Sequence, residues 1–179
     1  EPDGYDPEAG YPLVVLLHGF GASMEDLAVL CPTIDRSGYL YVCPNAPLEF
    51  QLGPGMVGYG WTPPRSEGTS EDVTRAVKQV NQLTEEVIEQ YHTPPGQAVL
   101  VGFSQGGTMS LRCGLPNPDT FAGLGALSCY LNEPGDLKDN LPEKRDQSVF
   151  MAHGVYDEVA SVEMARKTKD FLEEQGYSP

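Results

Sequence analysis

Short apolar runs alternate with longer amphipathic or polar segments along most of this 179-residue chain. The runs are apolar throughout rather than at every second position, which is typical of parallel strands buried on both faces. Strands are therefore expected at 12–18, 39–44, 97–103, within 121–130 and at 148–154. Helices are expected at 23–31, 70–91, 105–114 and 161–175. This order predicts one α/β domain over residues 1–179, with a mainly parallel, doubly wound sheet and helices on both faces.

The helix expected at 70–91 has the clearest pattern, because its apolar residues recur at three- and four-residue steps. Ser23 is the expected N-cap of the helix at 23–31, and Gly176 the residue that follows the last helix. The segment 45–70 has no period, is rich in glycine and proline, and holds the only tryptophan. A loop of this length in a compact domain is usually functional, so we expect it to lie over the active site.

Composition and net charge indicate which kinds of molecule the protein is not expected to bind. The 26 acidic and 11 basic residues give a net charge of −15, which argues against nucleic acid and against stable association with anionic membranes. No apolar run reaches the roughly 20 residues of a membrane-spanning helix. The four cysteines form no C-x-x-C pair and have no histidine at metal-ligand spacing, so we expect reduced thiols, no metal site and a cytoplasmic protein.

The candidate nucleophile is Ser104. It lies in Gly102-Phe103-Ser104-Gln105-Gly106, a G-x-S-x-G pattern between an expected strand and an expected helix. Glycines two residues before and after the serine remove the Cβ atoms that would collide in the tight turn such a serine needs. The alternative is a glycine-rich turn whose serine only caps the helix.

Candidate oxyanion donors follow the first expected strand, in the sequence LLHGFG. The carboxyl ends of parallel strands meet at one edge of a sheet, so the backbone N–H groups of Phe20 and Gln105 could hold an oxyanion together. His18, in the same turn, could instead be a base, but its place at the end of a buried strand favours a structural role bonded to backbone.

The candidate acid is Asp157, in the sequence HGVYDEV after the expected strand at 148–154. An acid that follows the nucleophile in the chain agrees with the Ser, Asp, His order of many hydrolases. Glu158 is the alternative acid, and a further alternative is that Asp157 is a surface-loop carboxylate without a role.

The three motifs LLHGFG, GFSQGG and HGVYDEV, in this order and at these separations, resemble the carboxylesterase and acyl-protein thioesterase (phospholipase/carboxylesterase) family of α/β-hydrolases. CPNAP and the loop around Trp61 are also similar to that family. The resemblance implies an α/β-hydrolase fold and a monomeric or dimeric serine hydrolase that acts on small ester or thioester substrates without metal or cofactor. It also implies that Ser104 is the nucleophile, Asp157 the triad acid, and Phe20 and Gln105 the oxyanion donors.

The long loop could supply the acyl site. Trp61 and Met56 are the substrate-binding candidates that we select from its apolar residues, which are Phe50, Leu52, Met56, Val57, Tyr59 and Trp61. Packing of these residues on the sheet is an equal alternative. The net charge of −15 favours neutral small esters over anionic lipid assemblies.

The histidine of a Ser-His-Asp triad is not identified. The family pattern places it after the acid, beyond one more strand, whereas the histidines here are His18, His92 and His153. We expect His92 at the opposite edge of the sheet and His153 against the core. We therefore expect a segment of a longer chain that lacks the leading strands and the histidine segment; lost catalysis is the alternative.

The function predicted from the sequence is hydrolysis of short to medium acyl esters, and of thioesters as a second substrate type, through an acyl-Ser104 intermediate. The main alternative is an inactive protein that binds ligands on a hydrolase scaffold. Acyl transfer by the same serine is a weaker alternative, because it requires a site that excludes water.

Overall fold

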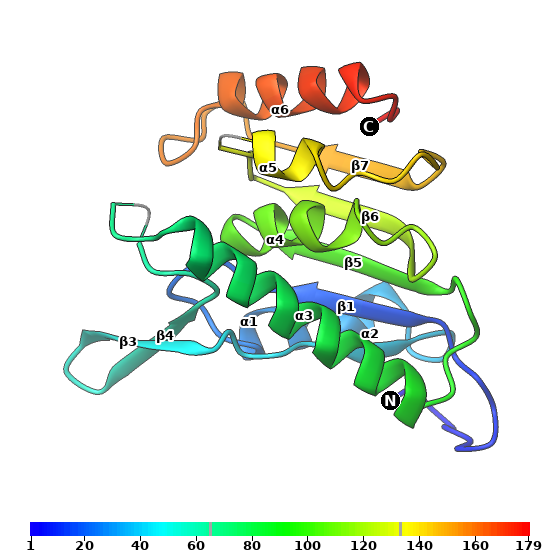
Figure 1. Cartoon of the computed structure of the whole chain (residues 1–179). Helices are drawn as coiled ribbons and strands as arrows, with labels where there is room; N and C mark the ends of the chain where they lie inside the picture. Colours follow the sequence, from blue (N-terminus) through cyan, green and yellow to red (C-terminus); the bar gives the residue numbers. More distant parts are fainter. Residues whose placement is uncertain (65, 133) are drawn as a thin grey trace.

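A five-stranded parallel sheet forms the centre of the computed structural model, which describes residues 1–64, 66–132 and 134–179 (Figure 1). The spatial order is β2-β1-β5-β6-β7, and every neighbouring pair is parallel. The strands are β1 (Leu13–Leu17), β2 (Leu40–Val42), β5 (Ala98–Phe103), β6 (Phe121–Leu127) and β7 (Ser148–Ala152). Each lies inside the range that its apolar run predicts, and the parallel sheet is confirmed.

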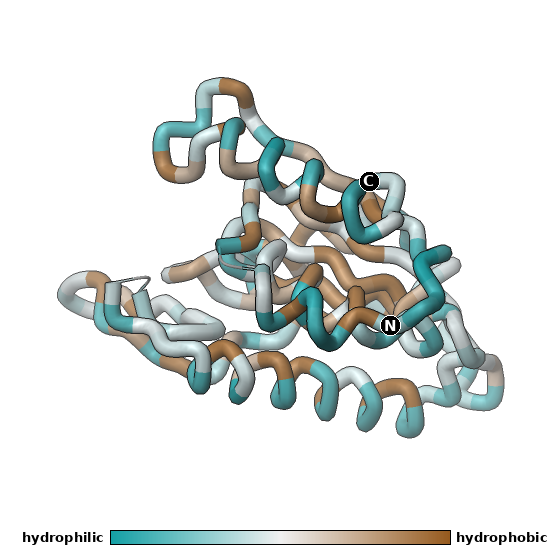
Figure 2. The backbone as a smooth tube through the Cα atoms, turned by 45° about the horizontal axis from the view of Figure 1, so that its top comes forward, coloured by the Kyte–Doolittle hydropathy of each residue, from teal (hydrophilic) through white to brown (hydrophobic). Residues whose placement is uncertain are grey.

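The register of the central strands brings two predicted motifs together. Leu13 pairs with Ala98 and Leu17 pairs with Gly102, so β1 and β5 end side by side. The turn that holds His18 therefore begins beside the turn that holds Ser104. Figure 2 shows the hydrophobic residues concentrated on the central strands, whereas the helices carry hydrophobic and hydrophilic residues in turn, as expected when each covers the sheet with one side.

The two longest helices agree closely with the pattern. The first, α3 (Ser70–Gln90), starts at a capping box in which Thr69 and Asp72 bind each other's backbone N–H. The last, α6 (Val162–Glu174), ends before Gly176, whose φ of 89° suits glycine. The helix that follows Ser104, α4 (Gln105–Gly114), has the predicted bounds. In Figure 1, α3 and α4 lie in front of the sheet, and the short helices α1 and α2 lie behind it.

The single helix predicted at 23–31 is wrong. The structure has two short helices, α1 (Glu25–Ala28) and α2 (Cys31–Ile34), and Ser23 is not an N-cap. Pro32 lies in the first turn of α2, where its missing N–H costs least. The same proline could not have donated a hydrogen bond inside a continuous helix, which explains the break.

The segment 45–70 is also more regular than predicted. It contains an antiparallel hairpin of β3 (Leu48–Gly53) and β4 (Met56–Gly60), and residue 65 lies outside the described part. Gly55, with φ 72°, lies in the hairpin turn. The missed signal is Gly-Pro-Gly at 53–55 between two runs of mixed polarity. A further short helix, α5 (Gly135–Lys138), lies between β6 and β7, where no helix is predicted.

Candidate active site

Ser104 occupies a strained turn between β5 and α4. Its φ of 53° and ψ of −117° are unusual for a residue with a side chain, and such strain is typical of functional turns. The backbone is held on both sides: Ser104 N–H donates to the Leu127 carbonyl (2.8 Å), and the Ser104 carbonyl accepts from Thr108 N–H (3.1 Å). The side chain makes no capping hydrogen bond. The hydroxyl is therefore not used to cap the helix, which was the alternative role for this serine.

The two flanking glycines are required by close backbone contacts. A Cβ atom on Gly102 would overlap the Gly106 carbonyl and lie 2.5 Å from the Gly107 nitrogen. A Cβ atom on Gly106 would overlap the Leu17 carbonyl and lie 2.6 Å from the His18 carbonyl oxygen. Because all of these neighbours are backbone atoms, they cannot rotate away. The spacing of the G-x-S-x-G pattern is thus explained by the packing of α4 directly against the ends of β1 and β5.

The turn after β1 lies against Ser104, the candidate nucleophile. A Cβ atom on Gly19 would be 3.3 Å from the Ser104 Cβ, so the predicted oxyanion loop and the serine are neighbours. Among the described residues, no hydrogen bond uses the backbone N–H of Phe20 or Gln105. Both groups therefore remain able to donate to a ligand, and the Gln105 N–H is also at the positive end of the α4 dipole.

His18 is a structural residue in this site, as its position at the end of a buried strand predicts. Its Nδ1 donates to the Gly19 carbonyl (2.7 Å), and its Nε2 accepts from Ala46 N–H (3.0 Å). These partners fix one neutral tautomer, because a carbonyl can only accept and an N–H can only donate. The ring is buried. Both of its nitrogens are occupied in holding the oxyanion loop against the segment after β2.

Trp61 supports the same loop from the other side. Its indole Nε1–H donates to the His18 carbonyl (2.9 Å), its backbone N–H donates to Gln105 Oε1 (2.8 Å), and Gln105 Nε2 donates to the Thr62 hydroxyl (2.8 Å). The side chain is only 4% exposed. Contact of Trp61 with a substrate stays a prediction, whereas its support of the loop is observed. Sequence reasoning missed the Gln105 side chain and Thr62, which only the fold brings together.

The tip of the hairpin is open to solvent. Met56, the second predicted substrate contact, is 62% exposed. Closer to the serine, the rings of Phe20 and Phe50 pack with centroids 4.9 Å apart. The hairpin therefore presents apolar side chains on the side of the site formed by the oxyanion loop.

Asp157 lies in the loop after β7. Its Oδ1 accepts from the N–H groups of Val159 (2.9 Å) and Ala160 (2.9 Å). The Ala160 N–H, then the Val159 N–H, and next the nearby His153 hold the pKa of the Asp157 carboxyl below its usual value, and burial opposes them only in part. The alternative acid, Glu158, is exposed, and its side chain makes no hydrogen bond within the described part of the chain.

The hydrogen bonds and positions of the three histidines separate them from the Ser104 hydroxyl. His153 Nε2 donates to the Ala160 carbonyl (2.7 Å) and lies 3.6 Å from Asp157 Oδ2. His92 follows the last residues of α3, at the opposite end of the sheet from Ser104. With His18 committed to backbone partners, none of the three is hydrogen-bonded to Ser104 in the described structure.

The described residues include no cluster of three or more His, Cys, Asp or Glu side chains that could hold a metal ion. None of the described helices combines the length and apolar character needed to cross a bilayer.

Comparison with known proteins shows that the chain is similar to esterases and thioesterases. The family model described as Phospholipase/Carboxylesterase matches residues 6–177. Acyl-protein thioesterase 1 of Emericella nidulans is 30% identical over 183 residues, which cover 91% of this chain and 76% of that protein. Acyl-protein thioesterase 1 of Mycosarcoma maydis is 31% identical over 178 residues, covering 89% and 74%.

Solved structures give the same result. The crystal structure of esterase PE8 has a TM-score of 0.80 and 28% identity, and the match covers 94% of this chain and 80% of that one. Arabidopsis thaliana SOBER1 has a TM-score of 0.79 at 24% identity, covering 95% and 86%, and supports the fold alone.

Proposed function

Because the chain belongs to the phospholipase/carboxylesterase family and is a hydrolase of ester or thioester bonds, we propose that it works through an acyl intermediate on Ser104. The observation that carries this proposal is the elbow itself. A serine is held at φ 53° with its hydroxyl uncapped, and it is flanked by glycines that tolerate no side chain. Such strain is typical of functional turns, and in a G-x-S-x-G turn between strand and helix it exposes the serine oxygen at the end of the sheet.

The oxyanion hole is proposed to be the backbone N–H groups of Phe20 and Gln105. The close approach of Gly19 to Ser104 supports this role, as does the absence of another acceptor for either N–H among the described residues. When the serine oxygen attacks the carbonyl carbon, the carbonyl oxygen gains negative charge, which two preorganised donors stabilise. The same donors act again when water releases the acyl group.

Asp157 is proposed to orient the histidine that takes the proton of Ser104. Its position after β7 supports this role, because the turn fixes the carboxylate through two backbone N–H groups at the same end of the parallel sheet as Ser104. The base itself is not His18, His92 or His153, since their bonds and positions direct them elsewhere. We therefore propose none of these three histidines as the base.

The proposed substrates are short to medium acyl esters, with thioesters as a second type. Phe20 and Phe50, together with the exposed Met56, offer an apolar surface for an acyl chain next to the oxyanion loop. The thioester reaction is suggested by the relatives named acyl-protein thioesterase 1. We propose that the protein acts as a monomer or homodimer, which sedimentation analysis distinguishes.

The test is replacement of Ser104 by alanine in the whole protein. Hydrolysis of p-nitrophenyl acetate and butyrate should fall by at least about 10³-fold, because no nucleophile remains. Mass spectrometry of the wild type, quenched during turnover, should show one added acyl group on the peptide that contains Ser104.

The matched control is Ser128→Ala. Ser128 also follows a strand of the central sheet and also has a positive φ of 48°, but the proposal gives it no role. Turnover should be unchanged within about 2-fold in this variant. Equal loss in both variants, or an acyl group found elsewhere, would contradict the assignment of Ser104.

We also propose a cytoplasmic, reducing setting. Cys31, Cys43 and Cys113 form no disulfide in the described structure, although Cys31 Sγ and Cys43 Sγ lie 3.7 Å apart, close enough for a small movement to join them. Burial, together with the Cys31 thiol, raises the pKa of Cys43 to about 12, which slows its oxidation by reducing the thiolate fraction. Alkylation of the denatured protein, isolated without reductant, should modify all four thiols; two protected thiols would contradict this setting.

A further inference from the structure

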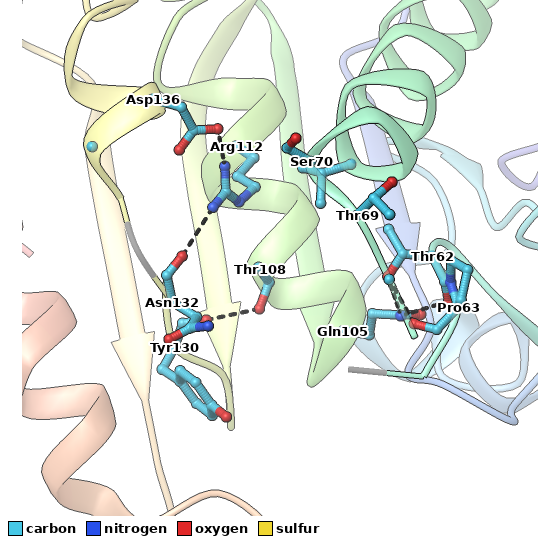
Figure 3. A pocket seen from close by; sticks show the side chains of 13 residues that line it. Thr62, Pro63, Thr69, Ser70, Gln105, Thr108, Arg112, Tyr130, Asn132 and Asp136 are labelled. Atoms are coloured by element: carbon cyan, nitrogen blue, oxygen red, sulfur yellow. Dashed lines mark hydrogen bonds and ion pairs between the residues drawn. The ribbon is translucent and has the colours of Figure 1, made fainter. Parts of the chain in front are cut away.

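A cavity of about 520 Å³, lined by both polar and apolar groups, adjoins the proposed oxyanion donor Gln105 and extends away from it along α4 (Figure 3). One wall is formed by the Thr62–Pro63 segment and the first turn of α3. The other wall is formed by α4, the segment after β6 and the start of α5. The side chains that matter for the argument are Ser70, Gln105, Thr108, Arg112, Asn132 and Asp136. Nothing in the ester hydrolysis described above uses this space beyond Gln105.

The charges that line the cavity neutralise each other. Arg112 Nη1 donates to Asp136 Oδ2 (2.9 Å), and Nη2 donates to the Asn132 carbonyl (3.1 Å). The Arg112 side chain is 11% exposed, so its guanidinium is largely desolvated and depends on these partners. A ligand with its own negative charge would have to compete with Asp136 for Arg112. It would also enter a protein with a net charge of −15.

Hydrogen-bonding capacity remains on both sides of the cavity. Thr108 donates its hydroxyl proton to the Tyr130 carbonyl (3.0 Å), which leaves its oxygen able to accept. Within the described residues, neither the Ser70 hydroxyl nor the Asn132 side-chain amide makes a hydrogen bond, and Asp136 Oδ1 is not used in the ion pair. Both donors and acceptors therefore line a space without net charge. Alcohol hydroxyls, which donate and accept at once, match such a lining.

The cavity and the apolar hairpin lie on different sides of Gln105. The side-chain amide of Gln105 is bonded to Trp61 N–H and to Thr62, so the chain passes from β4 to the cavity wall at this point. Phe20 and Phe50 pack at the end of β4, before Trp61, and a Cβ atom on Gly60 would touch both rings. An ester bound at Ser104 can thus place its acyl chain against the aromatic pair and its alcohol portion in the cavity.

From these contacts we propose that the cavity is a subsite for a hydroxylated alcohol, so that esters of polyols or sugars are preferred over esters of simple alkanols. The inference rests on the proposed function, because it places the ester carbonyl at Ser104. Asp136, Asn132, Ser70 and Thr108 bind the hydroxyl groups, while Arg112 holds Asp136 in place.

The first experiment compares two butyrate esters that differ only in their hydroxyl groups. Glycerol monobutyrate has two, and n-propyl butyrate has none. In the whole protein, kcat/KM for the glyceryl ester should exceed that for the propyl ester by about 10-fold or more, the effect expected of one or two hydrogen bonds, one of them to a charged group. Hydrolysis of p-nitrophenyl butyrate, dependent on Ser104, is measured in parallel and reports the proposed function alone.

Two variants test the lining residues. Asp136→Asn should reduce the glyceryl-to-propyl ratio by about 10-fold, and Ser70→Ala by about 3-fold, because each removes one partner of a hydroxyl group. The matched control is Asp119→Asn, an exposed aspartate paired with Lys144 at 3.7 Å that does not line the cavity. That variant should keep the wild-type ratio. An unchanged ratio in Asp136→Asn would overturn the proposal.

Binding of a polyol provides a readout that does not need turnover. Xylitol added to the ¹⁵N-labelled protein should give saturable shifts of the Ser70, Thr108 and Asn132 amides, with a midpoint raised about 10-fold in Asp136→Asn. Absence of saturable shifts overturns the proposal, even if no ester is turned over. A ratio near one, with p-nitrophenyl butyrate still hydrolysed through Ser104, overturns the subsite and leaves the proposed function. Preference for an ester whose alcohol carries a carboxylate would make the cavity an anion site instead.

Discussion

The carboxyl ends of β5 and β7 belong to the same sheet edge, but the turns that follow them are built differently. After β5, Ser104 is held by backbone bonds on both sides and by the packing of Gly102 and Gly106 against backbone atoms. After β7, Tyr156 and Val159 are 92% and 89% exposed. There, Asp157 is held by the N–H groups of its own turn and by nearby His153.

The difference separates the parts of the proposed site that long-range packing fixes from those that local bonds fix. The nucleophile and oxyanion turns are connected to β1, β4, α4 and the segment after β2, so their geometry cannot change without disturbing the core. The Asp157 turn can change with little effect on other elements. Substitutions in the two turns should therefore have very different effects on the free energy of unfolding.

The largest difference is expected between two glycine-to-alanine substitutions. Gly106→Ala places a Cβ atom in the backbone of Leu17 and His18, and it should lower the free energy of unfolding by about 3 kcal/mol or more. Gly154→Ala, after β7, is the matched control, because its Cβ atom would be 4.0 Å from the nearest atom, Asp157 Cβ. Urea denaturation of both variants measures the difference. Similar midpoints would show that the elbow is less tightly packed than the structure indicates.

A smaller difference is expected between two aromatic substitutions. Trp61→Phe removes the indole N–H that donates to the His18 carbonyl, and leaving that buried acceptor unpaired should cost about 1–3 kcal/mol. Turnover of p-nitrophenyl butyrate should fall as well, since the oxyanion loop loses a support. Tyr156→Phe, on the exposed turn, should change the free energy of unfolding by less than about 0.5 kcal/mol. The free energy of unfolding is measured by thermal and urea denaturation. If Trp61→Phe and Tyr156→Phe lowered it equally, the difference inferred between the two turns would be contradicted.

The smallest expected effect is the loss of stability at low pH that results from protonation of Asp157. The pKa of the Asp157 carboxyl is lowered in the folded protein by the Ala160 and Val159 N–H groups, so the charged form stabilises the fold above the ordinary value of 3.8. This contribution is lost as the pH falls through the lowered pKa. An NMR titration of the Asp157 carboxyl should give a midpoint below 3.8. The stability difference between wild type and Asp157→Asn should shrink as the pH falls through that range, and a midpoint at or above 3.8 would contradict the assignment.

Much of the sheet could be predicted from the sequence, because its strands are apolar on both faces and their order follows from alternation with helices. The bounds of α4 were predicted for the same reason, since the elbow fixes where β5 ends and the helix begins. The break between α1 and α2 depended on one proline in an otherwise helical pattern. The hairpin of β3 and β4 was missed because its strands are half exposed and lack strict alternation.

The supporting contacts of the site could not be predicted. Trp61 and Gln105 are 44 residues apart, and His18 and Ala46 are 28 residues apart. No local pattern records such pairs, because they form only when the ends of β1, β4 and β5 come together. The motif therefore identified which residues are candidates for chemistry, while the fold identified which residues position them.

The contact between Trp61 and the oxyanion loop also gives the protein an internal optical probe. The chain has one tryptophan, and its indole N–H is bonded to the carbonyl of His18, the residue before Gly19. Fluorescence from this one residue therefore reports on the loop without any label. Ligands that move the loop should change the emission wavelength of the intact protein, which allows binding to be followed in real time.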